Sequence, residues 1–165
     1  MPEIVYDIVL FIHSVLRYVI VVAGLIAIVL AFRGWLTRKA FTALDSRLGM
    51  IYTTSLHLQL LVGLLLYGVF SPLTQAAFAN MGAAMQSAPL RFYAVEHIAV
   101  MILGIIVATV GRSLSRRAKD DAGKHRMAAI LYTISFILIL VSIPWPWATA
   151  GAARPLNPFH MFTGD

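Results

Sequence analysis

Four long stretches of the chain are almost continuously apolar, and polar residues gather in the connectors between them. The apolar runs cover about residues 4–32, 48–70, 92–111 and 127–147. Each run offers the roughly 20 residues that a helix needs to cross the hydrocarbon core of a bilayer. Because the apolar positions do not alternate with period two, the pattern predicts helices and excludes a transmembrane barrel. We therefore expect an all-α integral membrane protein, with residues 1–147 forming a bundle of four transmembrane helices.

The composition agrees with a membrane environment. Of the 165 residues, 60% are hydrophobic and only 12% are charged, and the mean hydropathy is +0.84. An ordinary soluble domain is about half apolar and about a quarter charged. The chain has no cysteine, which excludes disulfides, iron–sulfur clusters and covalent attachment of a c-type haem. The first apolar run is too long for a cleavable signal and lacks a basic segment before it, so we expect it to remain as a span.

The charges of the connectors predict the orientation of the bundle. The connector after the first run holds four basic residues and one acid, and the connector after the third run holds six basic residues. Residues 71–90, between the second and third runs, carry no charge. The positive-inside rule therefore places the two basic connectors in the cytoplasm and both termini on the outer, periplasmic side of a bacterial inner membrane. The net charge of +6 is explained by this topology and by membrane lipid as a partner, and no nucleic-acid partner is expected.

The segment after the fourth run differs from the rest of the chain. Residues 148–165 are interrupted by proline and glycine and are too polar to span a membrane. We expect an extended outer tail that lies against headgroups or docks on other subunits of a larger complex.

Several ionisable side chains fall within the apolar runs. They are His13 and Arg17 in the first run, His57 in the second, and Glu96 and His97 in the third. A charged group inside a bilayer costs on the order of 3 kcal/mol, so such residues are candidates for a functional site. In the alternative interpretation these residues have only a structural role: Arg17 pairs with Glu96, and each histidine forms a hydrogen bond to a neighbouring helix. The fourth run has no ionisable group, and we expect it to act as a scaffold.

Two histidines lie outside the runs. His125 is in the second basic connector and His160 is in the tail, and we expect solvent to surround both.

A glycine shares the face of each histidine within the spans. Gly24, Gly68 and Gly104 follow His13, His57 and His97 by eleven, eleven and seven residues, which places each within about 20° of the histidine on a helix. Glycine allows a backbone or a flat ligand to approach closely. A histidine on an apolar, glycine-lined face is typical of a haem site in a helical bundle, so we predict a haem b cofactor.

The depth of each histidine predicts which two share the iron. Counted from the outer helix ends, His97 lies about 8–9 Å deep, His13 about 13 Å and His57 about 20 Å. His13 with His97 is therefore the preferred pair of iron ligands, and His57 is the alternative ligand. Arg17 or Arg91 would then pair with a haem propionate.

Glu96 needs a different role, because adjacent residues on a helix point about 100° apart. We expect Glu96 to face a neighbouring helix, where it pairs with Arg17 or accepts protons from a quinol. Gln59 is a second candidate for a quinone site.

Four sequence blocks carry a resemblance to a known family. HSVLRY begins at His13, HLQLLVGLLLY at His57 and LRFYAVEH at Leu90, and SIPWPW covers Ser142 to Trp147. In order and spacing these blocks resemble a family of short four-helix bacterial membrane proteins, common in Bacteroidetes-like organisms and labelled cytochrome b or cytochrome-b-like. The resemblance implies haem binding and electron transfer. We expect such a protein to act as part of a respiratory or photosynthetic complex. It does not extend to the tail.

Two other functions remain open. The chain is also similar, more loosely, to four-helix membrane protoporphyrinogen oxidases, but those enzymes use an intramembrane lysine and no lysine lies within a span here. The other alternative is a haem-free accessory subunit of a larger membrane complex, in which the polar residues serve helix packing. An electron-transfer protein or subunit is expected rather than a stand-alone enzyme.

Overall fold

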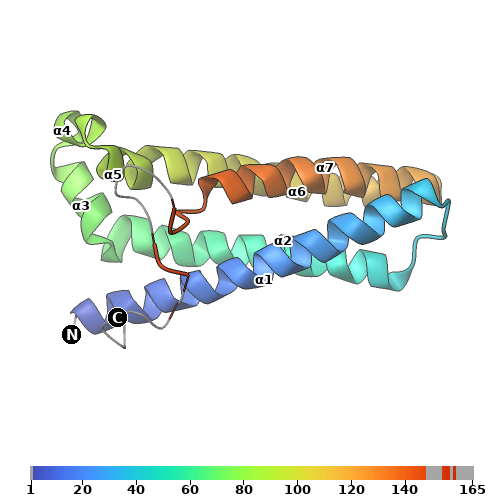
Figure 1. Cartoon of the computed structure of the whole chain (residues 1–165), viewed down its shortest axis with the longest axis horizontal. Coiled ribbons are helices and arrows are strands. Elements are labelled where there is room, and N and C mark those ends of the chain that lie inside the picture. The colour runs from blue at the N-terminus through green and yellow to red at the C-terminus, as the bar shows by residue number, and fades with distance from the viewer. Residues whose placement is uncertain (1, 148–153, 157, 159–165) are drawn as a thin grey trace.

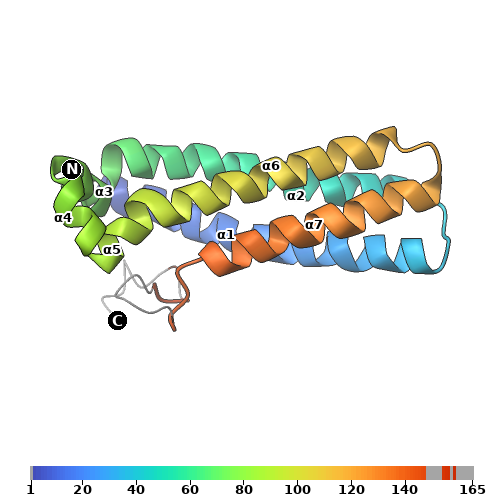
Figure 2. The same cartoon turned by 90° about the horizontal axis from the view of Figure 1, so that it is seen from above.

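Four long helices run side by side along the longest axis of the molecule, and short helices close one end (Figure 1, Figure 2). The computed structural model describes residues 2–147, 154–156 and 158. The long helices are α1 (Pro2–Leu36), α2 (Ala43–Leu65), α6 (His97–Arg117) and α7 (Asp121–Ser142). A π-helical turn, η1 (Leu66–Phe70), continues α2, and another, η2 (Phe92–Glu96), precedes α6. The short helices are α3 (Pro72–Ala79), α4 (Met81–Gln86) and α5 (Ala88–Arg91).

The described residues confirm the prediction of an all-helical chain with four helices that are long and apolar enough to cross a membrane. The candidate spans are Ile4–Leu36, Ala43–Phe70, Ala88–Arg117 and Asp121–Ser142. Both basic connectors lie at one end of the bundle, opposite α3–α5 (Figure 1). The uncharged connector is therefore a cap of short helices at the other end.

Local sequence signals explain where these helices begin and end. The Thr42 hydroxyl accepts from the Asp45 amide while the Asp45 carboxylate accepts from the Thr42 amide, so a capping box starts α2. The Asp120 carboxylate accepts from the Gly123 amide at 2.6 Å and starts α7. The fourth apolar run extends to residue 147, and we expected the proline at position 144 to stop its helix; α7 ends at Ser142 and Ile143 is extended. Pro144 is the reason, because a proline disfavours helical geometry in the residue before it.

Small residues line the contacts between the long helices. Ala23, Ala27 and Ala31 on α1 are buried together with Ala128 and Ala129 on α7. In a membrane, small side chains let helix backbones approach and gain packing energy. At the centre, the Tyr52 hydroxyl and the Ser135 hydroxyl form a buried hydrogen bond of 3.0 Å between α2 and α7. The helices α6 and α7 pack closely along their length, whereas α2 and α6 contact each other less extensively.

Candidate functional site

A cavity of about 150 Å³ lies at the end of the bundle away from the basic connectors. Its walls come from α1, α2, η1, η2 and α6, with the end of α7 and the start of the tail completing them. Most of the lining is apolar. The charged, imidazole and amide side chains in the lining are His13, Arg17, Gln59, His97 and Arg154.

The structure brings His13 and His97 together across this cavity. Their ring centroids are 6.4 Å apart and their planes make an angle of 61°. A metal ion bound by two imidazoles places the ring centroids about 6 Å apart, since each metal–nitrogen bond is about 2 Å long. The spacing therefore suits one metal ion held between the two histidines.

Hydrogen bonding fixes the orientation of His97. Its Nδ1 lies 2.7 Å from the backbone oxygen of Ser142, and the Ser142 hydroxyl donates to the His97 backbone oxygen at 3.2 Å. Because a carbonyl oxygen only accepts, Nδ1 carries the proton and Nε2 keeps a lone pair. This arrangement is typical of metal-binding histidines. We expected the fourth run to act only as a scaffold, yet α7 contributes this contact through its last residue.

The surroundings of His13 are set by α2. A Cβ atom added at Gly63 would meet Cε1 of His13 at 3.2 Å, so glycine leaves the room that the ring needs. Gln59, one turn earlier on α2, donates from Nε2 to the His13 backbone oxygen at 2.9 Å. The His13 Nδ1 atom is buried and has no hydrogen-bond partner among the described residues. Both α2 residues therefore position His13.

His57 lies elsewhere. Its side chain is exposed and its Nε2 bonds to the Thr109 hydroxyl at 3.1 Å, and it does not line the cavity. Gly63 faces His13, and a residue six positions earlier on the same helix points about 120° away. The rotation of α2 therefore turns His57 out of the site and brings Gln59 into it.

Two arginines contribute positive charge to the cavity. Arg17 is 8% exposed, and it donates to the Tyr18 hydroxyl at 2.9 Å, while its buried Nε has no partner among the described residues. Arg154 donates from Nε to the Tyr93 hydroxyl at 3.1 Å, and its backbone amide donates to the Pro144 oxygen at 3.0 Å. These contacts hold the start of the described tail segment against the cavity.

Arg154 keeps its positive charge in this position. Burial favours the neutral guanidine, but the phenol groups of Tyr93 and Tyr6 outweigh it and raise the pKa of Arg154 above its ordinary value. The sequence interpretation missed this residue because the tail was read as an extended outer segment. The isolated basic residue in that tail was the available signal. Most of the tail, including His160, lies outside the described residues.

Arg91 and Glu96 form a separate pair outside the cavity. Arg91 Nε lies 2.6 Å from the Glu96 carboxylate, and both side chains are partly exposed, at 39% and 48%. The π-helical turn η2 explains this spacing, since the wider turn brings residues five apart to the same side. We expected Glu96 to pair with Arg17 or accept protons. In the structure its partner is Arg91, and neither residue lines the cavity.

The predicted glycines do not surround the histidines. Cβ atoms added at Gly24 and Gly104 would come within 3 Å of Phe136 and Ile139, so these two glycines allow α7 to pack closely. A Cβ added at Gly68 would meet nothing within 4 Å. The glycine beside a cavity histidine is Gly63. It lies on α2 whereas His13 lies on α1, so comparing positions within one helix could not identify it.

The expectation that solvent surrounds His125 is wrong. Its side chain is 1% exposed and lies 5.0 Å from the Phe41 ring, measured between centroids. A Cβ at Gly34 would fall only 2.2 Å from the imidazole, so glycine on α1 makes the space that His125 fills. Because α7 begins at Asp121, His125 falls on its second turn, where it packs against α1 and the connector between α1 and α2, with Nε2 3.4 Å from the Ala40 backbone oxygen.

The donor set in the cavity fits a haem better than an ion held by protein alone. No group of three or more His, Cys, Asp or Glu side chains in the described parts of the chain could hold a metal ion. Two axial imidazoles suffice for a haem, because the porphyrin supplies the other four nitrogens. The cavity is smaller than the roughly 300 Å³ of a small ligand pocket, so its apolar side chains must move apart to admit a macrocycle.

Comparison of the chain with protein-family models, with curated proteins and with solved structures finds no match.

Proposed function

We propose that this chain binds a b-type haem through His13 and His97 and transfers electrons in a bacterial inner membrane. The observation that carries the proposal is the close approach of the two imidazoles, whose ring centroids lie 6.4 Å apart, a spacing suited to one iron. No signal in the described residues favours a different metal site. When bound, the haem would supply one-electron redox chemistry, and the chain would supply the ligands, the charge and the low-dielectric surroundings.

The contacts of the two ligands support this role. The Nδ1–H group of His97 donates to the Ser142 carbonyl oxygen, which makes Nε2 a stronger donor and prevents the ring from turning. His13 packs against Gly63, and Gln59 donates a hydrogen bond to the backbone oxygen of His13. The two helices that carry the ligands, α1 and α6, are thus braced by α2 and α7.

Positive charge near the ligands supports a cofactor that carries carboxylates. Arg17 and Arg154 would pair with the two propionates, and the unpartnered Nε of Arg17 offers a donor for this purpose. Arg91 was the sequence-based alternative, but its bond to Glu96 leaves it outside the cavity.

We also propose quinol as the electron donor. Gln59 lines the cavity and its buried Oε1 has no partner among the described residues, so it can accept a hydrogen bond from a quinol hydroxyl. Glu96 is partly exposed at the same end of the bundle and would receive the released proton.

A haem-free accessory subunit is the second candidate function. Trp147 is 70% exposed and stacks on Trp145, with ring centroids 5.3 Å apart, so an apolar ring is available to a partner at this end. The protoporphyrinogen-oxidase-like alternative has less support, because the cavity lining contains no lysine among the described residues.

Absorption spectra of protein purified in mild detergent test the main proposal. We expect a low-spin haem spectrum that shifts on reduction, and its loss or conversion to a high-spin spectrum in His13→Ala and His97→Ala. His57→Ala is the matched control and should keep the wild-type spectrum. A folded wild-type protein without haem, or an unaltered spectrum in His97→Ala, would refute the proposal. Colourless protein recovered only with other subunits would favour the accessory role.

We further propose that the basic connectors face the cytoplasm and both termini face the periplasm. The support is that all ten basic residues of the two long connectors lie at one end of the bundle. A reporter inserted near Pro89 should be active only in the periplasm, and cytoplasmic activity would reverse this orientation.

A further inference from the structure

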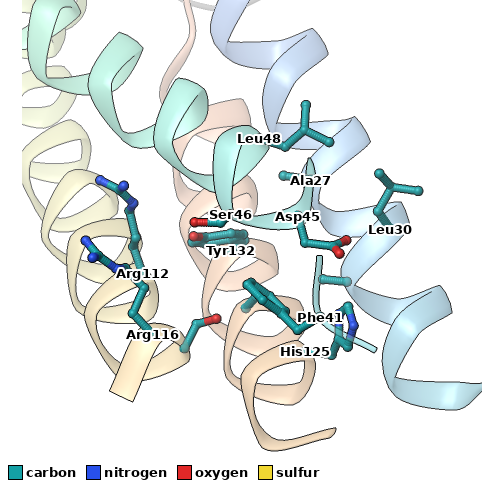
Figure 3. Close-up of a pocket in the computed structure, with 13 residues that line it drawn as sticks. Ala27, Leu30, Phe41, Asp45, Ser46, Leu48, Arg112, Arg116, His125 and Tyr132 are labelled. Carbon is teal, nitrogen blue, oxygen red and sulfur yellow. The ribbon is translucent and has the colours of Figure 1, made fainter. Parts of the chain in front are cut away.

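A second, much smaller cavity lies at the opposite end of the bundle, beside the basic connectors (Figure 3). Its volume is about 10 Å³, enough for roughly one water molecule. All four long helices line it, together with Phe41 from the connector between α1 and α2, and the polar lining contributed by α2 and α6 includes Arg112, Arg116 and Ser46. The proposed haem site uses none of these residues.

The two arginines are an unusual pair. They are one turn apart on α6, and Figure 3 shows both side chains lying alongside each other on the side that faces α2. Like charges four residues apart on a helix repel each other. The ion pairs among the described residues are Arg91 with Glu96 and Lys124 with Asp121, so no carboxylate within the described chain neutralises Arg112 or Arg116. The Nε of Arg112 is buried without a partner.

The nearest acid does not serve this purpose. Asp45 lines the same cavity, but its Oδ2 accepts from the Thr42 amide at 2.8 Å and from the Thr42 hydroxyl at 2.6 Å. Figure 3 shows its carboxylate on the far side of Ser46 from the arginines. Among the described residues, the arginine pair therefore has no anionic partner.

Helix dipole and topology explain only part of this arrangement. Basic residues near the end of α6 are stabilised by the negative end of that helix, and basic connectors are expected in the cytoplasm. These two effects account for Arg116 and Arg117, whose side chains are both exposed. Neither explains why Arg112 is half-buried with its Nε turned away from solvent.

We propose that Arg112, Arg116 and Ser46 bind the phosphate of an anionic phospholipid beside this cavity, which is too small to hold the phosphate itself. A guanidinium can hold a phosphate through two parallel hydrogen bonds, and the Ser46 hydroxyl adds a donor from α2. Arg112 lies about five residues before the end of α6, and Ser46 lies three residues after the start of α2, so both are at headgroup depth. Lipid phosphates are the anions present at that depth in a bilayer, and basic pockets between spans are known to bind them.

The test is lipid retention measured by native mass spectrometry on the full chain in a neutral detergent. Phosphatidylglycerol should bind in preference to phosphatidylcholine, and Arg112→Gln with Arg116→Gln should weaken phosphatidylglycerol binding by roughly 25-fold, since each surface arginine contributes about a factor of five. Arg117→Gln with Lys119→Gln removes the same charge from the exposed end of α6 and should weaken it less than about threefold.

One further variant and one further ligand test whether the site requires the arginine charge and whether it binds a lipid or free phosphate. Ser46→Glu places a carboxylate opposite the arginines, and this variant should lose the preference for phosphatidylglycerol while its helix content by circular dichroism stays at the wild-type level. Inorganic phosphate at the same concentration should not raise the thermal unfolding temperature as the lipid does. Equal losses in the two double variants, or equal stabilisation by phosphate, would overturn the lipid-headgroup assignment.

Discussion

Arg17→Met should change the stability of the cofactor-free and cofactor-bound protein in opposite directions. Arg17 lies well inside the span Ile4–Leu36, is 8% exposed and has an unpartnered Nε. Methionine has a similar length and no charge, so it fills the same space. The variant therefore separates the cost of the buried charge from its benefit to a bound carboxylate.

The magnitudes follow from the contacts of Arg17. A charged residue near the middle of a span costs about 3 kcal/mol. The hydrogen bond to Tyr18 at 2.9 Å and the position of the guanidinium 4.8 Å from the centroid of that ring offset about 1 kcal/mol each. Cofactor-free Arg17→Met should therefore be more stable than wild type by about 1 kcal/mol. Loss of a charge-assisted bond to a propionate, worth about 1.5–3 kcal/mol, should weaken haem binding by roughly 10- to 100-fold.

The assay combines haem titration with unfolding in detergent followed by circular dichroism, with and without haem. Arg91→Met is the matched control, because Arg91 lies outside the cavity and pairs with Glu96, and haem affinity should stay within about twofold of wild type. If Arg17→Met destabilises both forms equally, or leaves haem affinity unchanged, Arg17 is a packing residue and the reasoning is wrong.

Two other predictions concern α2 and its contacts. Gly63→Ala places a Cβ 3.2 Å from His13 Cε1, so we expect a shifted haem spectrum and weaker haem binding. Gly68→Ala is the control and should leave both unchanged, because nothing lies within 4 Å of a Cβ added there. Identical haem titrations for the two variants would contradict this prediction. Tyr52→Phe and Ser135→Ala each break the 3.0 Å hydrogen bond in the core. Their double-mutant cycle should give a coupling energy of about 0.6 kcal/mol in detergent unfolding, and strict additivity would show that the bond contributes nothing to stability.

The number of long helices and the depth of residues along them follow directly from the sequence. The lengths of the four apolar runs predict the spans because a helix in lipid has a fixed rise and no other way to satisfy its backbone groups. The match in depth between His13 and His97 predicts their approach for the same reason, and their ring centroids are 6.4 Å apart. Axial position along a span is thus well determined by counting residues.

Rotation about the helix axis is determined less well. The turns η1 and η2 shift the phase of the helix, so an angular count that crosses η1 no longer gives the face on which Gly68 lies. The pairing of Arg91 with Glu96, five residues apart, has the same origin. The burial of His125 against Gly34 and the contact of Arg154 with Tyr93 join segments far apart in the chain, which no local pattern reports.

The early end of α7 bears on how the protein is made. Because this helix stops at Ser142, one side of the cavity is completed by Ile143, Pro144 and the segment at Arg154, which are synthesised after all four spans. All four spans can therefore insert and pack before the cavity is closed. A hydrophobic cofactor would enter sideways from the lipid during this interval, so its loading need not compete with membrane insertion of the bundle.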